Sequence, residues 1–106
     1  MTVDDTPRWR LTLYVRGASP ESAAAVETVR RICDEHLRGQ VDLQIVDIHD
    51  AGAQAVEDKI VVVPTLVKRM PEPRQKLVGD LSDFTWLQTA LDLHPAATQD
   101  IEREAP

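Results

Sequence analysis

Apolar and polar side chains alternate from Trp9 to Val15, which predicts a strand with one buried face. A Gly-Ala-Ser-Pro segment ends this pattern, and Ser19 is a good N-cap for a helix that starts at Pro20. Apolar side chains then recur at helical spacing, which predicts one buried stripe along the helix. The members of this stripe are Val26, Val29, Ile32, Cys33 and Leu37. We expect Gly39 to end the helix in the left-handed conformation.

The middle of the chain is rich in β-forming residues. The segment from Val41 to Ile48 is predicted as the second strand, because apolar residues alternate along its first half and fill both faces at its end. Residues 49–58 contain one glycine and several alanines, which predicts a short helix or a mobile loop. Ile60–Val63 is a strongly β-prone run that Pro64 interrupts and Thr65–Val67 resumes.

A hairpin and a final helix are predicted after the β-prone run. Pro71–Pro73 predicts a turn, and Gln75–Val78 predicts a short strand that follows it. We expect Ser82 to cap the last helix and Pro95 to stop it. The apolar side chains that share one face of this helix are Leu81, Phe84, Leu87 and Leu91.

The predicted order of elements is β-α-β-(α)-β-β-α. A strand, a long helix and a second strand predict a parallel crossover connection, which is right-handed in almost all proteins. This α/β order with a mixed sheet resembles the thioredoxin-like architecture. That fold carries a cis-proline that faces the first helix, and the break at Pro64 falls at the same point. Residues 8–94 then form one domain between a flexible arm (1–7) and an acidic tail (95–106).

Length and charge narrow the classes of function. The chain has 106 residues, which is enough for one domain with its own hydrophobic core. Twelve Lys and Arg against eighteen Asp and Glu give a formal charge of -6, which argues against nucleic acids and anionic membranes as main partners. No apolar run approaches the about 20 residues of a membrane span. The N-terminal segment has no apolar signal core, so we expect a cytoplasmic protein.

A single cysteine excludes an intramolecular disulfide and CxxC redox chemistry. In thioredoxin-like redox enzymes the reactive thiols lie at the turn between the first strand and the first helix, where the helix dipole stabilises a thiolate. The corresponding segment here, Gly17–Ser22, contains no thiol. Cys33 comes more than three helical turns later, and we predict that it is a small buried hydrophobe.

Other chemical sites remain weaker alternatives. Ser19 could orient a glutathione thiol, although capping the helix explains it more simply. A mixed zinc site is conceivable, but its spacing is generic and His36 is expected to face water. Its ligands would come from Cys33, His36, Asp47, His49 and Asp50. The adjacent Glu57 and Asp58 are interpreted as solvated surface carboxylates. We therefore assign no catalytic, cofactor-binding or metal-binding residue and predict a protein that is not an enzyme.

Several segments resemble the KaiB family of circadian clock proteins. Leu11–Pro20 is similar to the family's "LxLYVxGxTP" opening, and Glu57–Leu66 is similar to its "EDKILATPTL" segment. Pro71–Leu93 contains counterparts of its "PPP…IGDLS…GLDLL" end. These blocks occur in order across about residues 9–93, so together they are far more specific than any one of them.

The resemblance implies a non-enzymatic regulator without a cofactor that docks onto a KaiC-like ATPase and modulates its phosphorylation cycle. It also implies two folds, a monomeric thioredoxin-like form and an alternate form that is a homo-oligomer (dimer or tetramer) with a rearranged C-terminal half. Ala90 and Asp92 lie in the segment that would switch. Ala90 replaces a common family glycine, and we predict that it favours the thioredoxin-like form, since alanine is the better helix former by about 1 kcal/mol.

The resemblance also implies which residues contact partners. It places the KaiC-facing surface at the start of the first helix and at the proline loop. The residues nominated for this surface are Arg16, Ser19, Pro20, Glu21, Lys59, Pro64 and Lys68. A simpler interpretation of Arg16, Lys59 and Lys68 is that they are solvated surface residues. The family captures the activator KaiA with a Tyr-Ala-x-Lys stretch, and Val41, Asp42 and Gln44 stand at the matching positions, which makes capture of KaiA doubtful.

Two other functions stay open from the sequence. A KaiB-like protein could be a signalling or stress adaptor outside a clock, with the same fold and another partner. A small glutathione-using enzyme of thioredoxin-like fold is the less favoured alternative.

Overall fold

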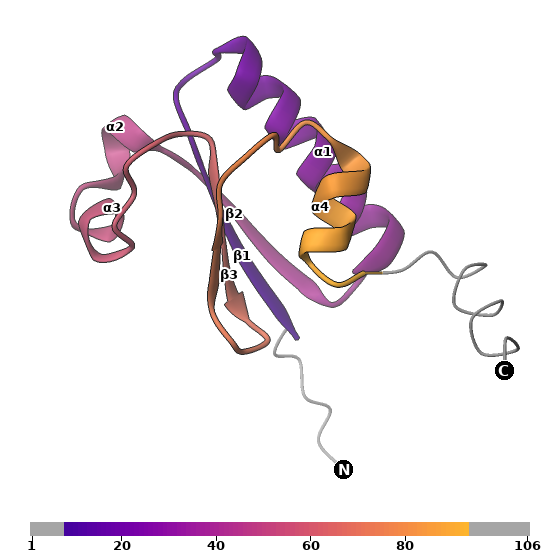
Figure 1. Cartoon of the computed structure of the whole chain (residues 1–106). Helices are drawn as coiled ribbons and strands as arrows, with labels where there is room; N and C mark the ends of the chain where they lie inside the picture. The colour runs from indigo at the N-terminus through magenta and orange to yellow at the C-terminus, as the bar shows by residue number, and fades with distance from the viewer. Residues whose placement is uncertain (1–7, 94–106) are drawn as a thin grey trace, which may run out of the picture.

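The computed structural model describes residues 8–93 (Figure 1). Its elements are β1 (Trp9–Val15), α1 (Pro20–His36), β2 (Val41–Asp47), α2 (Ile48–Ala51), α3 (Ala53–Glu57), β3 (Thr65–Met70), β4 (Gln75–Leu77) and α4 (Phe84–Ala90). The predicted arm (1–7), the predicted tail (95–106) and Pro95 lie outside the described residues. None of the helices in the described part of the chain has the length and apolar character needed to cross a membrane.

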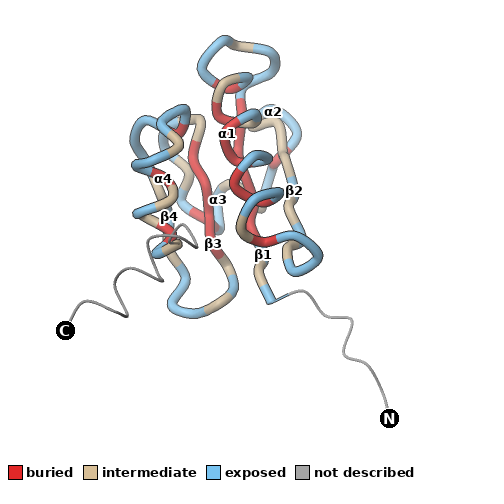
Figure 2. Tube along the Cα trace, turned by 90° about the vertical axis from the view of Figure 1, so that its right-hand side faces the viewer, coloured by how far each residue is buried: buried red, intermediate tan, exposed pale blue. Residues whose placement is uncertain are grey.

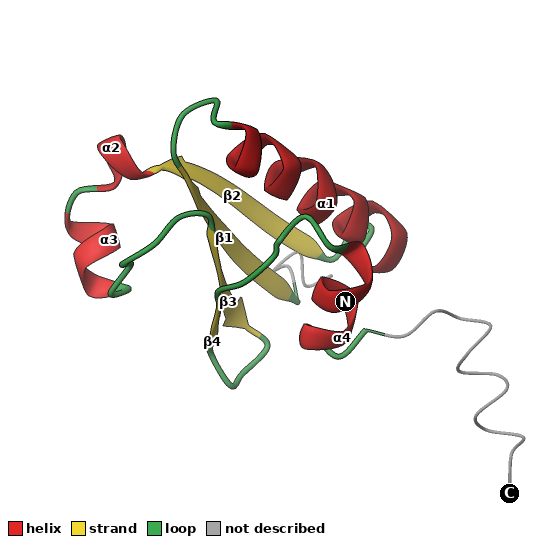
Figure 3. Ribbon diagram, turned by 45° about the horizontal axis from the view of Figure 1, so that its top comes forward, coloured by secondary structure: helices red, strands yellow, loops and turns green. Residues whose placement is uncertain are grey.

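The four strands form one mixed sheet in the order β2-β1-β3-β4 (Figure 3). β1 and β2 are parallel, with Trp9 opposite Val41 and Val15 opposite Asp47. β3 is antiparallel to β1 and to β4, so β3 and β4 form a hairpin. The predicted α/β class, the parallel pair and the hairpin are confirmed.

The side chains of β1 alternate between the two faces of the sheet. Leu11, Leu13 and Val15 join the larger apolar cluster, to which α1 and α4 contribute. Tyr14 points to the opposite face and packs with Val67 and with the short helices α2 and α3. Figure 1 shows these two pairs of helices on opposite sides of the sheet. Buried residues follow β1, β3 and the inner side of α1 (Figure 2).

The first helix begins as the sequence predicts and ends earlier. The Ser19 side chain accepts a hydrogen bond from the Ser22 amide, and Pro20 is the first helical residue. The helix ends at His36, because Leu37 turns into the core and the Gln40 amide bonds to the Leu37 carbonyl. The predicted helix end at Gly39 is therefore wrong, but the predicted left-handed conformation of this glycine is confirmed, since it has a φ of 75° in the turn toward β2.

The predicted strand at Ile60–Val63 is also wrong. The Ile60 amide bonds to the Ala55 carbonyl at 3.0 Å, so this residue still closes the turn after α3. Lys59 has a φ of 56°, which directs the chain away from an extended path. Pro64 has no amide hydrogen to donate, and β3 starts only at Thr65. Of the β-prone valines before it, Val61 and Val62 are exposed in a loop, and Val63 is partly buried against the cluster that contains Tyr14.

The last helix is capped one residue later than predicted. The Asp83 carboxylate accepts a hydrogen bond from the Trp86 amide at 3.0 Å, which satisfies the start of α4. Ser82 is not the cap, because its amide and hydroxyl both bond to the Asp80 carboxylate instead. The predicted apolar face is confirmed: Leu81, Leu87 and Leu91 are buried, and Phe84 packs against them.

Candidate docking surface

The turn between β1 and α1 is held by hydrogen bonds among its own residues. The Arg16 amide donates to the Ser22 hydroxyl at 2.9 Å, and the Ser19 amide donates to the Arg16 carbonyl at 3.2 Å. Gly17, with a φ of 48°, donates its amide to the Asp47 carboxylate at 3.0 Å. The Ser19 oxygen is occupied as the helix cap. These hydrogen bonds close the turn, and it contains no thiol.

A cleft of about 350 Å³ opens beside this turn. The first turn of α1 forms one wall, Pro64 lies opposite, and the loop before α4 forms the third side. The lining residues are Pro20, Glu21, Ala24, Pro64, Gly79, Asp80, Leu81 and Ser82. The Thr28 hydroxyl bonds to the Ser82 carbonyl at 3.2 Å, which fixes the loop to α1. A Cβ atom at Gly79 would lie 3.0 Å from the Trp86 ring, and the φ of 154° is one that other residues rarely adopt, so a substitution there would be strained.

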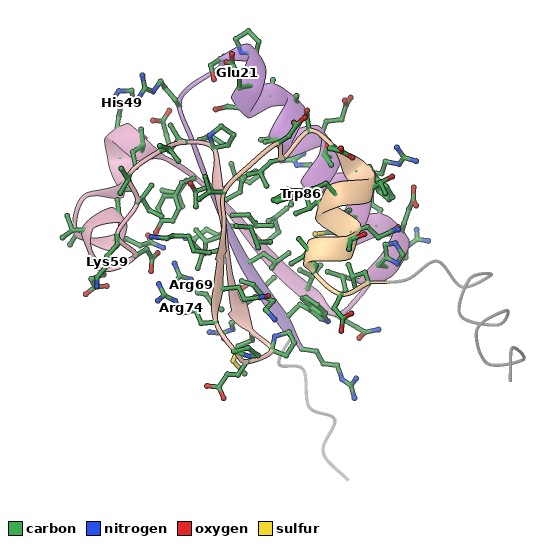
Figure 4. The ribbon with its side chains drawn as sticks, viewed as in Figure 1. Glu21, His49, Lys59, Arg69, Arg74 and Trp86 are labelled. Carbon is green, nitrogen blue, oxygen red and sulfur yellow. The ribbon has the colours of Figure 1, made fainter. Side chains whose placement is uncertain are left out.

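Five of the seven nominated contact residues lie at this turn or cleft. Pro20, Glu21 and Pro64 line the cleft, and Arg16 and Ser19 belong to the turn beside it. Figure 4 shows Glu21 at the start of α1, well separated from Lys59.

Lys59 and Lys68 lie elsewhere. Lys59 is exposed at the end of α3 and lines a different hollow. Lys68 is only 7% exposed, and its ammonium group lies 5.9 Å from the centre of the Trp9 ring. The interpretation of Lys68 as a solvated surface residue is therefore wrong, and we leave it out of the docking surface.

The side chains of Cys33 and His36, considered above as zinc ligands, have structural contacts in the fold. Cys33 is buried, and burial followed by the charge of Asp34 raises its pKa to about 11, so it is not a thiolate at neutral pH. His36 does not simply face water as predicted, because its Nε2 lies 2.9 Å from the Gln88 side chain and its ring stacks on Phe84. Within residues 8–93, no three His, Cys, Asp or Glu side chains gather closely enough to hold a metal ion.

Asp47 and His49 are used to start α2. The Asp47 carboxylate accepts the backbone amide of His49 at 2.9 Å and lies 3.0 Å from the His49 ring nitrogen. The hydrogen bond from the His49 amide is the main reason why the pKa of Asp47 is lowered. This carboxylate therefore links α2 to the turn before α1, through Gly17.

A buried ionic cluster lies on the same face as α2 and α3, and the sequence did not reveal it. Asp58, predicted as a solvated carboxylate, is only 6% exposed, so that prediction is wrong. Its carboxylate accepts hydrogen bonds from the Tyr14 hydroxyl and from Arg74. Arg69 donates two more, at 3.1 and 2.5 Å, and a third from its Nε to the Thr12 hydroxyl at 3.0 Å.

The protonation states of this cluster follow from its bonds. The hydrogen bonds from Arg69 are the main reason why the pKa of Asp58 is lowered to about 2, although burial acts in the opposite direction. The hydrogen bond from Tyr14 and the positive charge of Arg74 also lower this pKa. Burial, followed by the hydrogen bond to Asp58, raises the pKa of Tyr14 to about 12. At neutral pH the cluster thus contains a carboxylate, a neutral phenol and two guanidinium groups.

The only sequence signal for this cluster was the distribution of charge. Residues 59–78 contain five Lys and Arg and one Glu, although the whole chain has a formal charge of -6. Asp58 immediately precedes this segment, but its partners lie 11, 16 and 44 positions away, so no local spacing connects them.

Comparisons with known proteins point to one family. Residues 12–93 match the family model described as the KaiB domain. The circadian clock protein KaiB3 of Synechocystis sp. is 38% identical over 95 residues, which cover 90% of this chain and 93% of that protein. The circadian clock oscillator protein KaiB of Gloeothece citriformis is 39% identical over 94 residues, 89% of each chain.

Solved structures agree with the fold. The N-terminal domain of SasA from Synechococcus elongatus superposes with a TM-score of 0.67 at 29% identity, over 87% of this chain and 90% of that domain. Mitochondrial thioredoxin 3 from Saccharomyces cerevisiae reaches a TM-score of 0.66 at 12% identity, over 83% of this chain and 80% of that one. The second likeness concerns the fold alone.

Proposed function

The chain belongs to the KaiB family of clock proteins, and from this premise we propose that it is a regulatory protein that binds a KaiC-like ATPase and modulates its phosphorylation cycle. The observation that supports this proposal most is the state of the turn before α1. The turn keeps the thioredoxin-like scaffold but offers no thiol, and its serine hydroxyls are bound in the cap. Such a turn is suited to docking and not to disulfide exchange.

The docking surface that we propose consists of Arg16, Ser19, Pro20, Glu21 and Pro64. All of them are exposed or half-buried, and three line the cleft. The cleft has an apolar wall of proline and alanine side chains beside the carboxylates of Glu21 and Asp80, so it can take an apolar group and orient a polar one.

Binding to a purified KaiC-like ATPase, with and without ATP, is the direct test. We expect a shift in size-exclusion chromatography with the unmodified protein and at least a fivefold weaker interaction for Glu21→Lys, about 1 kcal/mol. Glu27→Lys changes the same charge on an exposed position of the same helix and should bind normally. Absence of any complex, or equal weakening by both variants, would contradict the proposal.

The edge strand β2 contains the positions that match the family's KaiA-capturing stretch. β2 is at one edge of the sheet, and Asp42 and Gln44 are exposed on it. β2 carries the carboxylate of Asp42 and no aromatic side chain, so we expect that the protein does not capture KaiA. Adding KaiA to the mixture with the ATPase tests this point, because capture would increase the mass of the complex.

A further inference from the structure

The cleft beside the turn before α1 carries charge of one sign. Its ionisable lining residues are Glu21 and Asp80, and none of the residues that line it is Lys, Arg or His. Figure 4 shows Glu21 at the start of α1, well away from Arg69 and Arg74. The cleft is therefore an acidic hollow of about 350 Å³, at the low end of the range of about 300–1,000 Å³ that ligand pockets occupy.

Both carboxylates of the cleft are available to a partner. Asp80 accepts hydrogen bonds from the amide and the hydroxyl of Ser82, and both end on Oδ1, which leaves Oδ2 open to a further donor. The bond from the Ser82 hydroxyl is the main reason why the pKa of Asp80 is lowered, so this group is charged at neutral pH. Glu21 is exposed, and among residues 8–93 no ion pair involves either carboxylate.

The charge of the cleft disfavours an anion. α1 begins at Pro20, and the free amide groups at the start of a helix attract negative charge. Glu21 lies in the first turn of α1 and already supplies this charge. An added anion would also face Asp80, so the group that complements the cleft is a cation.

The remaining lining of the cleft is largely apolar. Pro20, Ala24, Pro64 and Leu81 contribute to it, and Leu81 is only 2% exposed, so this part of the wall belongs to the core. A small cation alone would leave the apolar lining in contact with water, whereas an apolar side chain would cover it. A metal ion or a polyamine therefore matches only part of the cleft.

We propose that the cleft binds a segment of a partner protein in which a lysine or arginine stands next to a large apolar residue. The cation pairs with Glu21 and Asp80. The apolar side chain packs against Pro20, Pro64 and Leu81. The segment belongs to the ATPase of the proposed function, on which this inference rests.

Titration of the isotope-labelled protein by NMR tests the proposal. The probe is a blocked hexapeptide in which leucine and arginine alternate between terminal glycines. Two matched peptides carry glutamate in place of arginine, or serine in place of leucine. We expect the leucine-arginine peptide to shift the amides of Ala24, Gly79 and Asp80, and added salt to weaken its binding. The glutamate peptide should cause no shifts there, and the serine peptide should bind about threefold more weakly or worse.

A pair of variants tests the contribution of charge. Glu21→Gln removes one charge from the cleft with little change in side-chain size, and it should weaken the leucine-arginine peptide by about threefold or more. Glu27→Gln makes the same change at an exposed position of α1 outside the cleft and should bind like the unmodified protein. Absence of shifts with the leucine-arginine peptide, equal weakening by both variants, or equally tight binding of the serine peptide would each overturn the proposal.

Formation of the ATPase complex reports on the proposed function separately, because the titration contains no ATPase. A protein that forms the complex but does not bind the leucine-arginine peptide contradicts only the chemistry assigned to the cleft. A protein that binds this peptide but forms no complex supports that chemistry and contradicts the choice of partner.

Discussion

The helices α1 and α4 cover one face of the sheet, α2 and α3 cover the other, and the two faces are joined to their helices differently. On the first face, Leu11, Leu13 and Val15 pack against the long α1 and against α4 in one apolar cluster. On the second face, Tyr14 and Val67 meet a single buried alanine of α2, and the Asp58 cluster lies beside them.

The difference follows from the length of the covering helices. α1 has 17 residues and can present a continuous apolar stripe, whereas α2 and α3 have four and five. Short helices bury little apolar area, so hydrogen bonds to Asp58 hold the chain to β1 and β3 instead. Apolar packing tolerates small displacements, but a shared carboxylate fixes Tyr14, Arg69 and Arg74 in one geometry.

The largest loss of stability should come from truncating a buried side chain on the apolar face. Leu13 is fully buried in β1, and Leu13→Ala should reduce the free energy of unfolding by about 4 kcal/mol, through lost burial and the cavity left behind. Urea denaturation at low and high salt measures this cost, which should not depend on salt. A cost below about 2 kcal/mol would mean that this face repacks freely.

Removing the carboxylate of the other face should cost slightly less. Asp58→Ala leaves Arg69 and Tyr14 without their acceptor, and we expect a loss of about 3 kcal/mol. Asp42→Ala, at an exposed position of β2, is the matched control and should change stability by less than about 0.5 kcal/mol. Equal losses from the two variants would show that the cluster does not hold the second face.

The chain has one tyrosine, so its ultraviolet titration reports the second face directly. Tyr14 should ionise near pH 12 in the folded protein, above its ordinary value of 10.0. Because the folded pKa is raised, the folded state should lose stability as the pH rises from 10 to 12. In Asp58→Ala the midpoint should fall only part of the way, since burial is the larger cause. A midpoint at the ordinary value in the unmodified protein would contradict the buried hydrogen bond.

The smallest loss of stability is expected from a substitution at the end of α4. Ala90 is the last residue of this helix, and Ala90→Gly should cost about 1 kcal/mol or less of helix stability. We predict a severalfold shift toward the alternate oligomer, measured by size-exclusion chromatography and NMR. Ala23→Gly weakens α1 similarly, but outside the C-terminal half, and should not cause this shift. If the two variants behave alike, Ala90 does not control the balance.

The predictions from sequence succeeded where a local pattern has a local cause. The alternation from Trp9 to Val15 and the cap at Ser19 are each decided by neighbours within a few positions. The run Ile60–Val63 has the same local preference for a strand, but the turn after α3 and Pro64 override it.

The turn before α1 and the Asp58 cluster differ in the same way, since only the first depends on residues that are close together in the sequence. The turn before α1 could be located from its own residues, and its lack of a thiol was visible at once. The Asp58 cluster could not be located, because Asp58 meets Tyr14 only when β1, the end of α3 and the β3–β4 hairpin come together. Burial of Lys68 also depends on a distant residue, Trp9.

The packing of Trp86 over Gly79 gives the molecule a built-in optical probe. Gly79 belongs to the lining of the cleft, so we expect a group that binds in the cleft against Gly79 to change the surroundings of the neighbouring indole ring. The second tryptophan, Trp9, lies beside Lys68 at the other end of β1, and we expect its signal to stay constant when the cleft is occupied. Tryptophan fluorescence of an unlabelled sample should therefore follow occupation of the cleft in real time, as a change in the Trp86 signal over the background of Trp9.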